Sequence, residues 1–211
     1  PAFFMRVWRG ATPLQPCGME VGALCTPLAG EDACGDGWAV SCDGDGATLL
    51  GVDGLGHGPE AAKAAAGAIH ALEQRPAAAP GEVLRTAHEL LRLTRGAALS
   101  VARIDYGGND VRFAGIGNVG GLVYDGMARR ALVSHNGIVG HNMRKVQEFA
   151  APFAPGALCV LYSDGIQSQW DLGDYPGLHV RAPALVAAVL MRDFIRRRDD
   201  AMVLVARRRM A

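Results

Sequence analysis

The sequence predicts an α+β protein whose strands pair in antiparallel fashion. Short apolar runs separated by Gly, Pro, Asn and Asp turns recur along the chain, as expected of strands joined by hairpins. Two amphipathic segments follow each other between residues 59 and 94, and a third helical pattern comes only at residues 183–196. Grouped helices and hairpin-linked strands favour separate helical and sheet layers over the alternating βαβ units of a parallel sheet.

Length and composition limit the class of protein. The chain has 211 residues, of which 50% are hydrophobic, so we expect a single domain over residues 1–211. Lys+Arg and Asp+Glu both number 21, a balance that argues against a nucleic-acid-binding protein. Neither a secretory signal nor an apolar run long enough to cross a bilayer is recognisable. The five cysteines predict reduced thiols, and we expect a cytoplasmic monomer without membrane attachment.

The first part of the chain is expected to be rich in strands. Strands are predicted at residues 3–8 and 19–25, each bounded by loop-forming residues. Two further strands, at residues 38–42 and 47–52, flank the sequence Asp-Gly-Asp-Gly at residues 43–46, which is a strong hairpin signal.

This hairpin is expected to place two carboxylates opposite each other. A turn centred between Gly44 and Asp45 pairs residues whose numbers sum to 89, and Asp36 and Asp53 satisfy that sum. Their Cα atoms should then lie roughly 5 Å apart. Like charges this close repel each other, so we expect a divalent metal ion between them. Asp43 and Asp45 are interpreted as turn formers, because the other ligands of a calcium loop are missing.

A glycine-rich turn follows the second strand of the hairpin. Residues 52–58 read Val-Asp-Gly-Leu-Gly-His-Gly and lead into a predicted helix at residues 59–73. Glycines let the backbone take positive φ angles, and a carboxylate at a strand end suits a hard cation. The alternative is a tight turn with a solvated Asp53, but the pattern D-G-x-G-H-G at the start of a helix favours a functional site.

Later elements place two more carboxylates at strand ends. A second helix is predicted at residues 81–94, and the remaining strands at residues 98–104, 111–114, 121–124, 131–134, 146–149, 158–162 and 202–206. Asp164 follows the strand 158–162 and Asp199 precedes the last strand. Four carboxylates without Cys or His partners suit Mg²⁺ or Mn²⁺, and two such ions can activate water and bind phosphate oxygens. The alternative is four unrelated Asp residues in surface turns.

Four motifs in this order resemble those of the metal-dependent protein serine/threonine phosphatases. They are Gly35-Asp36, the segment at residues 52–58, Ser163-Asp164-Gly165 and Asp199-Asp200. The similarity covers about residues 30–207 and looks closest to the bacterial branch that includes SpoIIE, RsbU and RsbX, RsbX most of all.

The resemblance implies a four-layer αββα sandwich with a centre of two Mn²⁺ or Mg²⁺ ions. It implies that Asp53 bridges the ions and that Gly54 binds through its carbonyl oxygen. Asp200 would support the site without binding metal, and Gly117-Asn118 would form a turn. The implied metal ligands are Asp36, Asp53, Gly54, Asp164 and Asp199, and the implied catalytic residues are Asp53, Asp36 and Asp164.

The resemblance also implies an activity and a class of partner. The expected enzyme hydrolyses phosphoserine or phosphothreonine on a bacterial regulatory protein, either STAS-type or a stressosome component, by direct attack of metal-activated water. No cysteine lies in a C-x5-R loop, so a thiol-based phosphatase is excluded. Two alternatives stay open: an inactive phosphatase-like binding module and a hydrolase of small phosphoesters.

Three groups of residues do not follow the family pattern. The arginine that binds substrate phosphate in eukaryotic relatives has no clear counterpart, and Arg6 and Arg9 are the nearest candidates. His57 could act as a general acid, but we favour an exposed or hydrogen-bonded turn residue. The basic run at residues 196–198 could bind an acidic or phosphorylated partner, but we interpret it as a helix C-terminus stabilised by the helix dipole.

Overall fold

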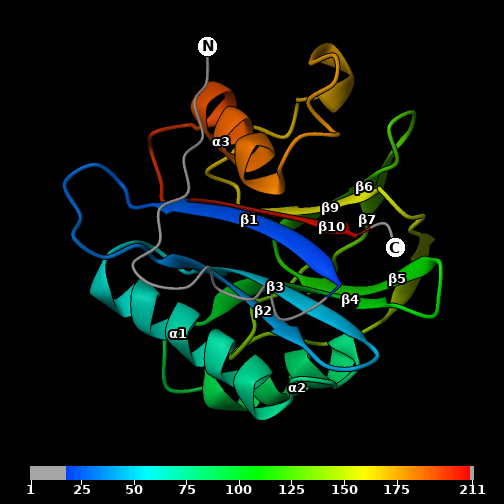
Figure 1. Cartoon of the computed structure of the whole chain (residues 1–211). Helices are drawn as coiled ribbons and strands as arrows, with labels where there is room; N and C mark the ends of the chain where they lie inside the picture. Colours follow the sequence, from blue (N-terminus) through cyan, green and yellow to red (C-terminus); the bar gives the residue numbers. More distant parts are fainter. Residues whose placement is uncertain (1–17, 210–211) are drawn as a thin grey trace, which may run out of the picture.

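Two antiparallel sheets lie face to face, with helices on both outer sides (Figure 1). The computed structural model describes residues 18–209. Helices α1 (Pro59–Gln74) and α2 (Pro80–Leu90) cover one sheet, and α3 (Pro183–Phe194) covers the other. The predicted α+β sandwich is therefore confirmed, whereas the strand expected at residues 3–8 lies outside the described residues.

Each sheet contains five strands. The sheet beneath α3 has the order β1-β10-β9-β6-β7, and the sheet above α1 and α2 has the order β2-β3-β4-β5-β8. The strands of the first sheet are β1 (Met19–Thr26), β6 (Gly120–Tyr124), β7 (Arg129–Leu132), β9 (Leu158–Tyr162) and β10 (Ala201–Arg208). Those of the second are β2 (Asp36–Cys42), β3 (Gly46–Gly54), β4 (Ala97–Asp105), β5 (Asp110–Ile116) and β8 (Phe149–Pro152).

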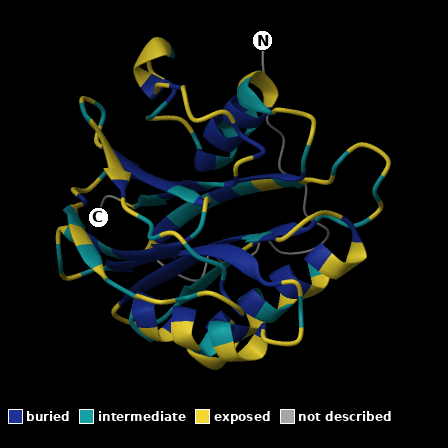
Figure 2. Cartoon of the chain, turned by 180° about the vertical axis from the view of Figure 1, so that it is seen from behind, coloured by how far each residue is buried: buried dark blue, intermediate teal, exposed yellow. Residues whose placement is uncertain are grey.

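Buried apolar side chains fill the space between the two sheets. In Figure 2 most of the strand residues of both sheets are coloured as buried. Leu49 and Phe113 from one sheet and Leu161 and Leu204 from the other belong to the same central cluster. Separate clusters lie under the helices on each side. Burial of these alternating apolar positions fixes the register of the strands, because a slip by one residue would turn them towards solvent.

Some predicted boundaries are wrong by a few residues. Helix α2 ends at Leu90 rather than at residue 94, because the next residues tighten into a turn in which the Thr94 N–H donates to the Leu91 carbonyl. Strand β8 begins at Phe149, not at residue 146, and it accommodates Pro152 because an edge strand needs fewer N–H donors.

The end of α3 changes the interpretation of the basic run at residues 196–198. The helix ends at Phe194, and Ile195 is already extended and forms an antiparallel bridge with Ile166. The basic residue of the last turn is Arg192. The expectation that residues 196–198 are a helix C-terminus is therefore wrong.

None of the helices between residues 18 and 209 combines the length and apolarity needed to span a bilayer.

Candidate metal centre

The β2–β3 hairpin brings Asp36 and Asp53 together. The two residues are direct partners in the antiparallel register, as the turn at residues 43–46 predicts. Asp43 closes that turn, since its Oδ1 accepts hydrogen bonds from the N–H groups of Asp45 and Gly46, both at 2.8 Å. The prediction that Asp36 faces Asp53 and the interpretation of Asp43 as a turn former are both confirmed.

Burial and mutual repulsion act strongly on this pair. Burial raises the pKa of Asp36 to about 8. A hydrogen bond from Ser163 lowers this pKa, whereas the charges of Cys34, Asp200 and Asp199 raise it further. Burial likewise raises the pKa of Asp53 to about 8, and the nearby charges add to it. Those charges belong to Asp36, Asp164, Asp199 and Asp200. The four carboxylates selected from the sequence therefore lie close enough to repel one another.

Asp164 is held by a residue from a distant turn. It follows β9 and is exposed, and its Oδ2 accepts a hydrogen bond of 2.7 Å from Asn118 Nδ2. Gly117 has a φ angle of +91°, so the turn expected at Gly117-Asn118 needs glycine there. The sequence analysis assigned Asn118 only to a turn and did not predict its contact with Asp164. The side-chain amide directly after a turn glycine was the signal that could have indicated this contact.

Asp200 fixes the loop that leads into β2. The carboxylate is 2% exposed, and its two oxygens accept hydrogen bonds of 2.7 Å from the backbone N–H groups of Leu28 and Gly35. A Cβ atom at Gly35 would lie 2.7 Å from Asp200 Oδ2, so only glycine fits. Asp200 therefore positions the start of β2, where Asp36 lies.

Asp199 has one carboxylate oxygen without a partner among the described residues. Its Oδ1 accepts a hydrogen bond of 2.9 Å from the Asp200 N–H, and its Oδ2 accepts none from residues 18–209.

Gly54 lies where the end of β3 meets α1. Its N–H donates to the Gly35 carbonyl at 3.0 Å, which ties the glycine-rich turn to the loop before Asp36. A Cβ atom at Gly54 would approach the Ala61 carbonyl oxygen to 2.3 Å. The absence of a side chain at this position is therefore a packing requirement, and it keeps the backbone next to Asp53 close to the helix.

The residues around Asp53 fit hydrated divalent cations. Asp36 Oδ2 is buried and has no hydrogen-bond partner within residues 18–209, which leaves a carboxyl oxygen available to a cation. In the same part of the chain, no three His, Cys, Asp or Glu side chains are arranged to hold an ion unaided.

His57 has a partner of its own beside the acidic cluster. Its Nδ1 lies 2.5 Å from Glu31 Oε1, and the imidazole is about half exposed. The pair links the glycine-rich turn to the loop fixed by Asp200. This agrees with the interpretation of His57 as an exposed, hydrogen-bonded turn residue.

Two thiols border the cluster, and no pattern in the sequence predicts that they lie close to each other. A hydrogen bond between Cys25 and Cys34 raises the pKa of Cys25 and lowers that of Cys34, and the charges of Asp36 and Asp200 raise the pKa of Cys25 further. Cys25 and Cys34 are free thiols, as is the buried Cys159. Cys42 is disulfide-bonded, so the expectation of reduced thiols is wrong at that position.

Comparison with solved structures shows which known fold the two sheets and their helices adopt. Over 90% of its length the chain is similar to RsbX in complex with magnesium (17% identity, 94% of that chain, TM-score 0.78). It is also similar over 91% of its length to the Mycobacterium tuberculosis serine/threonine phosphatase PstP/Ppp (13% identity, 99% of that chain, TM-score 0.69). Two stacked antiparallel sheets flanked by helices, with carboxylates at one end of the β2–β3 hairpin, are therefore the fold that the chain shares with these PP2C-type phosphatases.

The family follows from the sequence model that matches the chain. The model of Stage II sporulation protein E (SpoIIE) matches residues 43–209, and the chain belongs to this family of phosphatases. A chain from the structure described as "The bacterial stressosome: a modular system that has been adapted to control secondary messenger signaling" is 31% identical. That match covers 90% of the present chain and 99% of the other, with a TM-score of 0.82. None of the curated protein sequences compared with the chain matches it.

Proposed function

We propose that the chain is a metal-dependent protein serine/threonine phosphatase that acts on a bacterial regulatory phosphoprotein. The observation that carries this proposal is the acidic cluster around Asp53. Burial and repulsion raise the pKa values of Asp36 and Asp53 to about 8, although neither residue has a basic partner within residues 18–209. Burying carboxylates that repel each other destabilises the fold, and such groups are found most often at functional sites. Carboxylates with raised pKa values at the ends of strands are therefore candidates for a metal site.

Five residues would hold the ions in this proposal. Two Mn²⁺ or Mg²⁺ ions, when bound, would supply a water nucleophile and neutralise charge on the phosphate. The proposed ligands are Asp36, Asp53, Gly54 through its carbonyl oxygen, Asp164 and Asp199.

The protein's own contribution is to hold these ligands in place. Asn118 orients Asp164 by the hydrogen bond to Oδ2, and Asp200 holds the backbone that leads to Asp36. Such supporting contacts commonly change metal affinity or activity by about 10- to 100-fold when removed. The support extends over three chain segments, and the site depends on their packing.

The substrate proposed is a phosphorylated regulatory protein, either STAS-type or a stressosome component. This proposal rests on relatives described as RsbX and as part of the bacterial stressosome. The arginine that eukaryotic relatives use for substrate phosphate stays unassigned, and Arg6 and Arg9 lie outside the described residues.

Phosphate release in the presence of Mn²⁺ tests the proposal. We expect the chain to hydrolyse an aryl phosphate slowly and phosphoserine peptides or phosphoproteins with a higher kcat/KM. Asp53→Asn should abolish turnover, whereas Asp45→Asn, at the exposed tip of the same hairpin, is the matched control and should not. Binding of phosphopeptide without turnover would establish the inactive module instead. A kcat/KM that is higher for small phosphoesters than for any phosphoprotein would establish the small-molecule hydrolase.

A further inference from the structure

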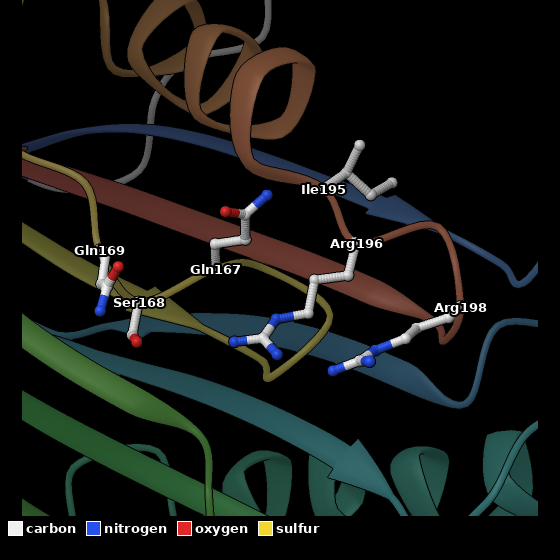
Figure 3. Close-up of a pocket in the computed structure, with 6 residues that line it drawn as sticks. All are labelled: Gln167, Ser168, Gln169, Ile195, Arg196 and Arg198. Carbon is white, nitrogen blue, oxygen red and sulfur yellow. The ribbon is translucent and has the colours of Figure 1, made fainter.

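A polar pocket lies beside the acidic cluster and is not part of it. It has a volume of about 490 Å³ and lies between the loop after β9 and the segment that joins α3 to β10 (Figure 3). Its lining contains a single apolar side chain, Ile195, and five polar ones, which are Gln167, Ser168, Gln169, Arg196 and Arg198. The pocket therefore offers hydrogen-bond donors and positive charge rather than a hydrophobic surface.

The walls of the pocket are attached to two of the proposed metal ligands. The Arg196 N–H donates to the Gly165 carbonyl at 2.8 Å, and Gly165 directly follows Asp164. Arg198 directly precedes Asp199. The Gln167 N–H donates to the carbonyl of the last residue of α3 at 2.9 Å, so the two walls are joined on both sides of the Ile166–Ile195 bridge. The pocket and the acidic cluster are thus held at a fixed separation.

Both guanidinium groups are available for a ligand. Arg196 and Arg198 are exposed, and neither forms an ion pair or side-chain hydrogen bond with any residue in the range 18–209. Some other exposed arginines do have carboxylate partners, such as Arg192 with Asp193 at 2.6 Å and Arg130 with Asp125 at 2.5 Å.

The backbone between the two arginines is unusual. Arg197 has a φ angle of +58°, and it is the one non-glycine residue with positive φ among residues 18–209. This conformation is unfavourable for a side chain with a Cβ atom, and such residues are found more often at functional sites. Figure 3 shows the side chains of Arg196 and Arg198 extending in the same direction. Each of these guanidinium groups can bind a carboxylate through paired N–H donors.

We propose that Arg196 and Arg198 bind acidic side chains that flank the phosphorylated residue of the protein substrate. The proposal rests on the proposed phosphatase function and adds a determinant of its specificity. The acidic cluster would receive the phosphorylated side chain, and residues within about three positions of it can reach an adjacent pocket, because an extended chain advances about 3.3 Å per residue. Gln167, Ser168 and Gln169 supply neutral groups suited to the peptide backbone.

Two phosphoserine peptides test the proposal. One carries Asp and Glu on both sides of the phosphoserine, and the other carries Asn and Gln at the same positions. We expect wild-type protein to have a KM about tenfold lower for the acidic peptide, the effect of two exposed charge pairs. The double variant Arg196→Gln/Arg198→Gln should lose this preference. Arg85→Gln, which removes one exposed arginine on α2, is the matched control and should keep it.

The readouts separate this proposal from the phosphatase proposal. Hydrolysis of an aryl phosphate by wild-type protein tests the phosphatase function alone. If the wild-type protein hydrolyses no phosphoester, the phosphatase proposal is wrong. The proposal that the pocket binds acidic side chains is then tested separately, by fluorescence anisotropy of the two labelled peptides with Asp53→Asn protein. A preference for the acidic peptide that persists in the double variant, in turnover or in binding, would overturn the proposal, as would no preference in wild-type protein. Unchanged thermal unfolding of the double variant checks that it is folded.

Discussion

The metal-free protein should lose stability as the pH rises, because of Asp36 and Asp53. The pKa of each carboxyl group is raised from 3.8 to about 8 in the folded protein. The folded state therefore binds more protons than the unfolded state between these two values, and stability falls as the pH rises from about 4 through about 8. At pH 5 both groups are protonated in the folded state, and at pH 9 both are ionised and repel each other.

The size of the effect follows from the size of the shift. One group with a raised pKa lowers the free energy of unfolding by about 1.4 kcal/mol for each pH unit in this range. For Asp53 the shift from 3.8 to about 8 corresponds to about 6 kcal/mol at pH 9. This is an upper limit, because part of it is repulsion that Asp53 shares with Asp36. Asn resembles a protonated Asp, so Asp53→Asn should match wild-type stability at or below about pH 4, where Asp53 is protonated in both the folded and the unfolded state. The variant should already be somewhat more stable than the wild type at pH 5 and should exceed it by about 2 kcal/mol or more at pH 9.

Urea denaturation in EDTA at pH 5, 7 and 9 measures this directly. Wild-type protein should become less stable across the series, and Asp53→Asn should lose less. Asp45→Asn, with its side chain in the exposed hairpin turn, should follow the wild type. Added Mn²⁺ should reverse the order at pH 9, because an ion that binds only the folded state stabilises it by mass action. Parallel stability curves for wild type and Asp53→Asn would refute the argument that these carboxylates repel each other in a buried site.

Three further outcomes are expected. EDTA-treated protein should regain phosphatase activity with Mn²⁺ or Mg²⁺, and recovery with Zn²⁺ alone would contradict an all-oxygen ligand set. Asn118→Ala should lower kcat by about tenfold or more, because Asp164 loses the hydrogen bond to its Oδ2; an unchanged kcat would show that this contact is unimportant. Asp43→Asn should cost about 2 kcal/mol of stability at pH 7 without loss of turnover, since the side chain of Arg103, only 5% exposed, loses a charged partner 2.6 Å away. Because Arg103 lowers the pKa of Asp43 to about 2, the wild type's advantage should disappear in acid denaturation between about pH 4 and pH 2.

Local chemistry made part of the site predictable. The turn at residues 43–46 defines its own hydrogen bonds, and antiparallel pairing then places Asp36 opposite Asp53 by counting along two strands. The helix after the glycine-rich turn was equally readable, since α1 begins at Pro59 as the pattern predicts. These features involve residues fewer than twenty positions apart, where one turn determines the geometry.

Contacts between distant segments could not be read from the sequence. The hydrogen bond from Asn118 to Asp164 spans 46 positions, and those from Leu28 and Gly35 to Asp200 span 172 and 165. Each of these hydrogen bonds depends on the order of the strands in a sheet. Burial of apolar residues determines that order, and the alternation of residues along a single strand does not reveal it.

The arginine pocket shows the same division. The sequence contained the three consecutive arginines at residues 196–198, and a pattern continuous with α3 led to their interpretation as its end. Tertiary structure decided otherwise, because the bridge between Ile166 and Ile195 stops the helix at Phe194 and places Arg196 and Arg198 beside the loop that follows Asp164. The sequence by itself determined which residues carry charge. The packing of β9, α3 and β10 decided which of those charges share one end of the molecule, because only the folded chain brings the three elements together.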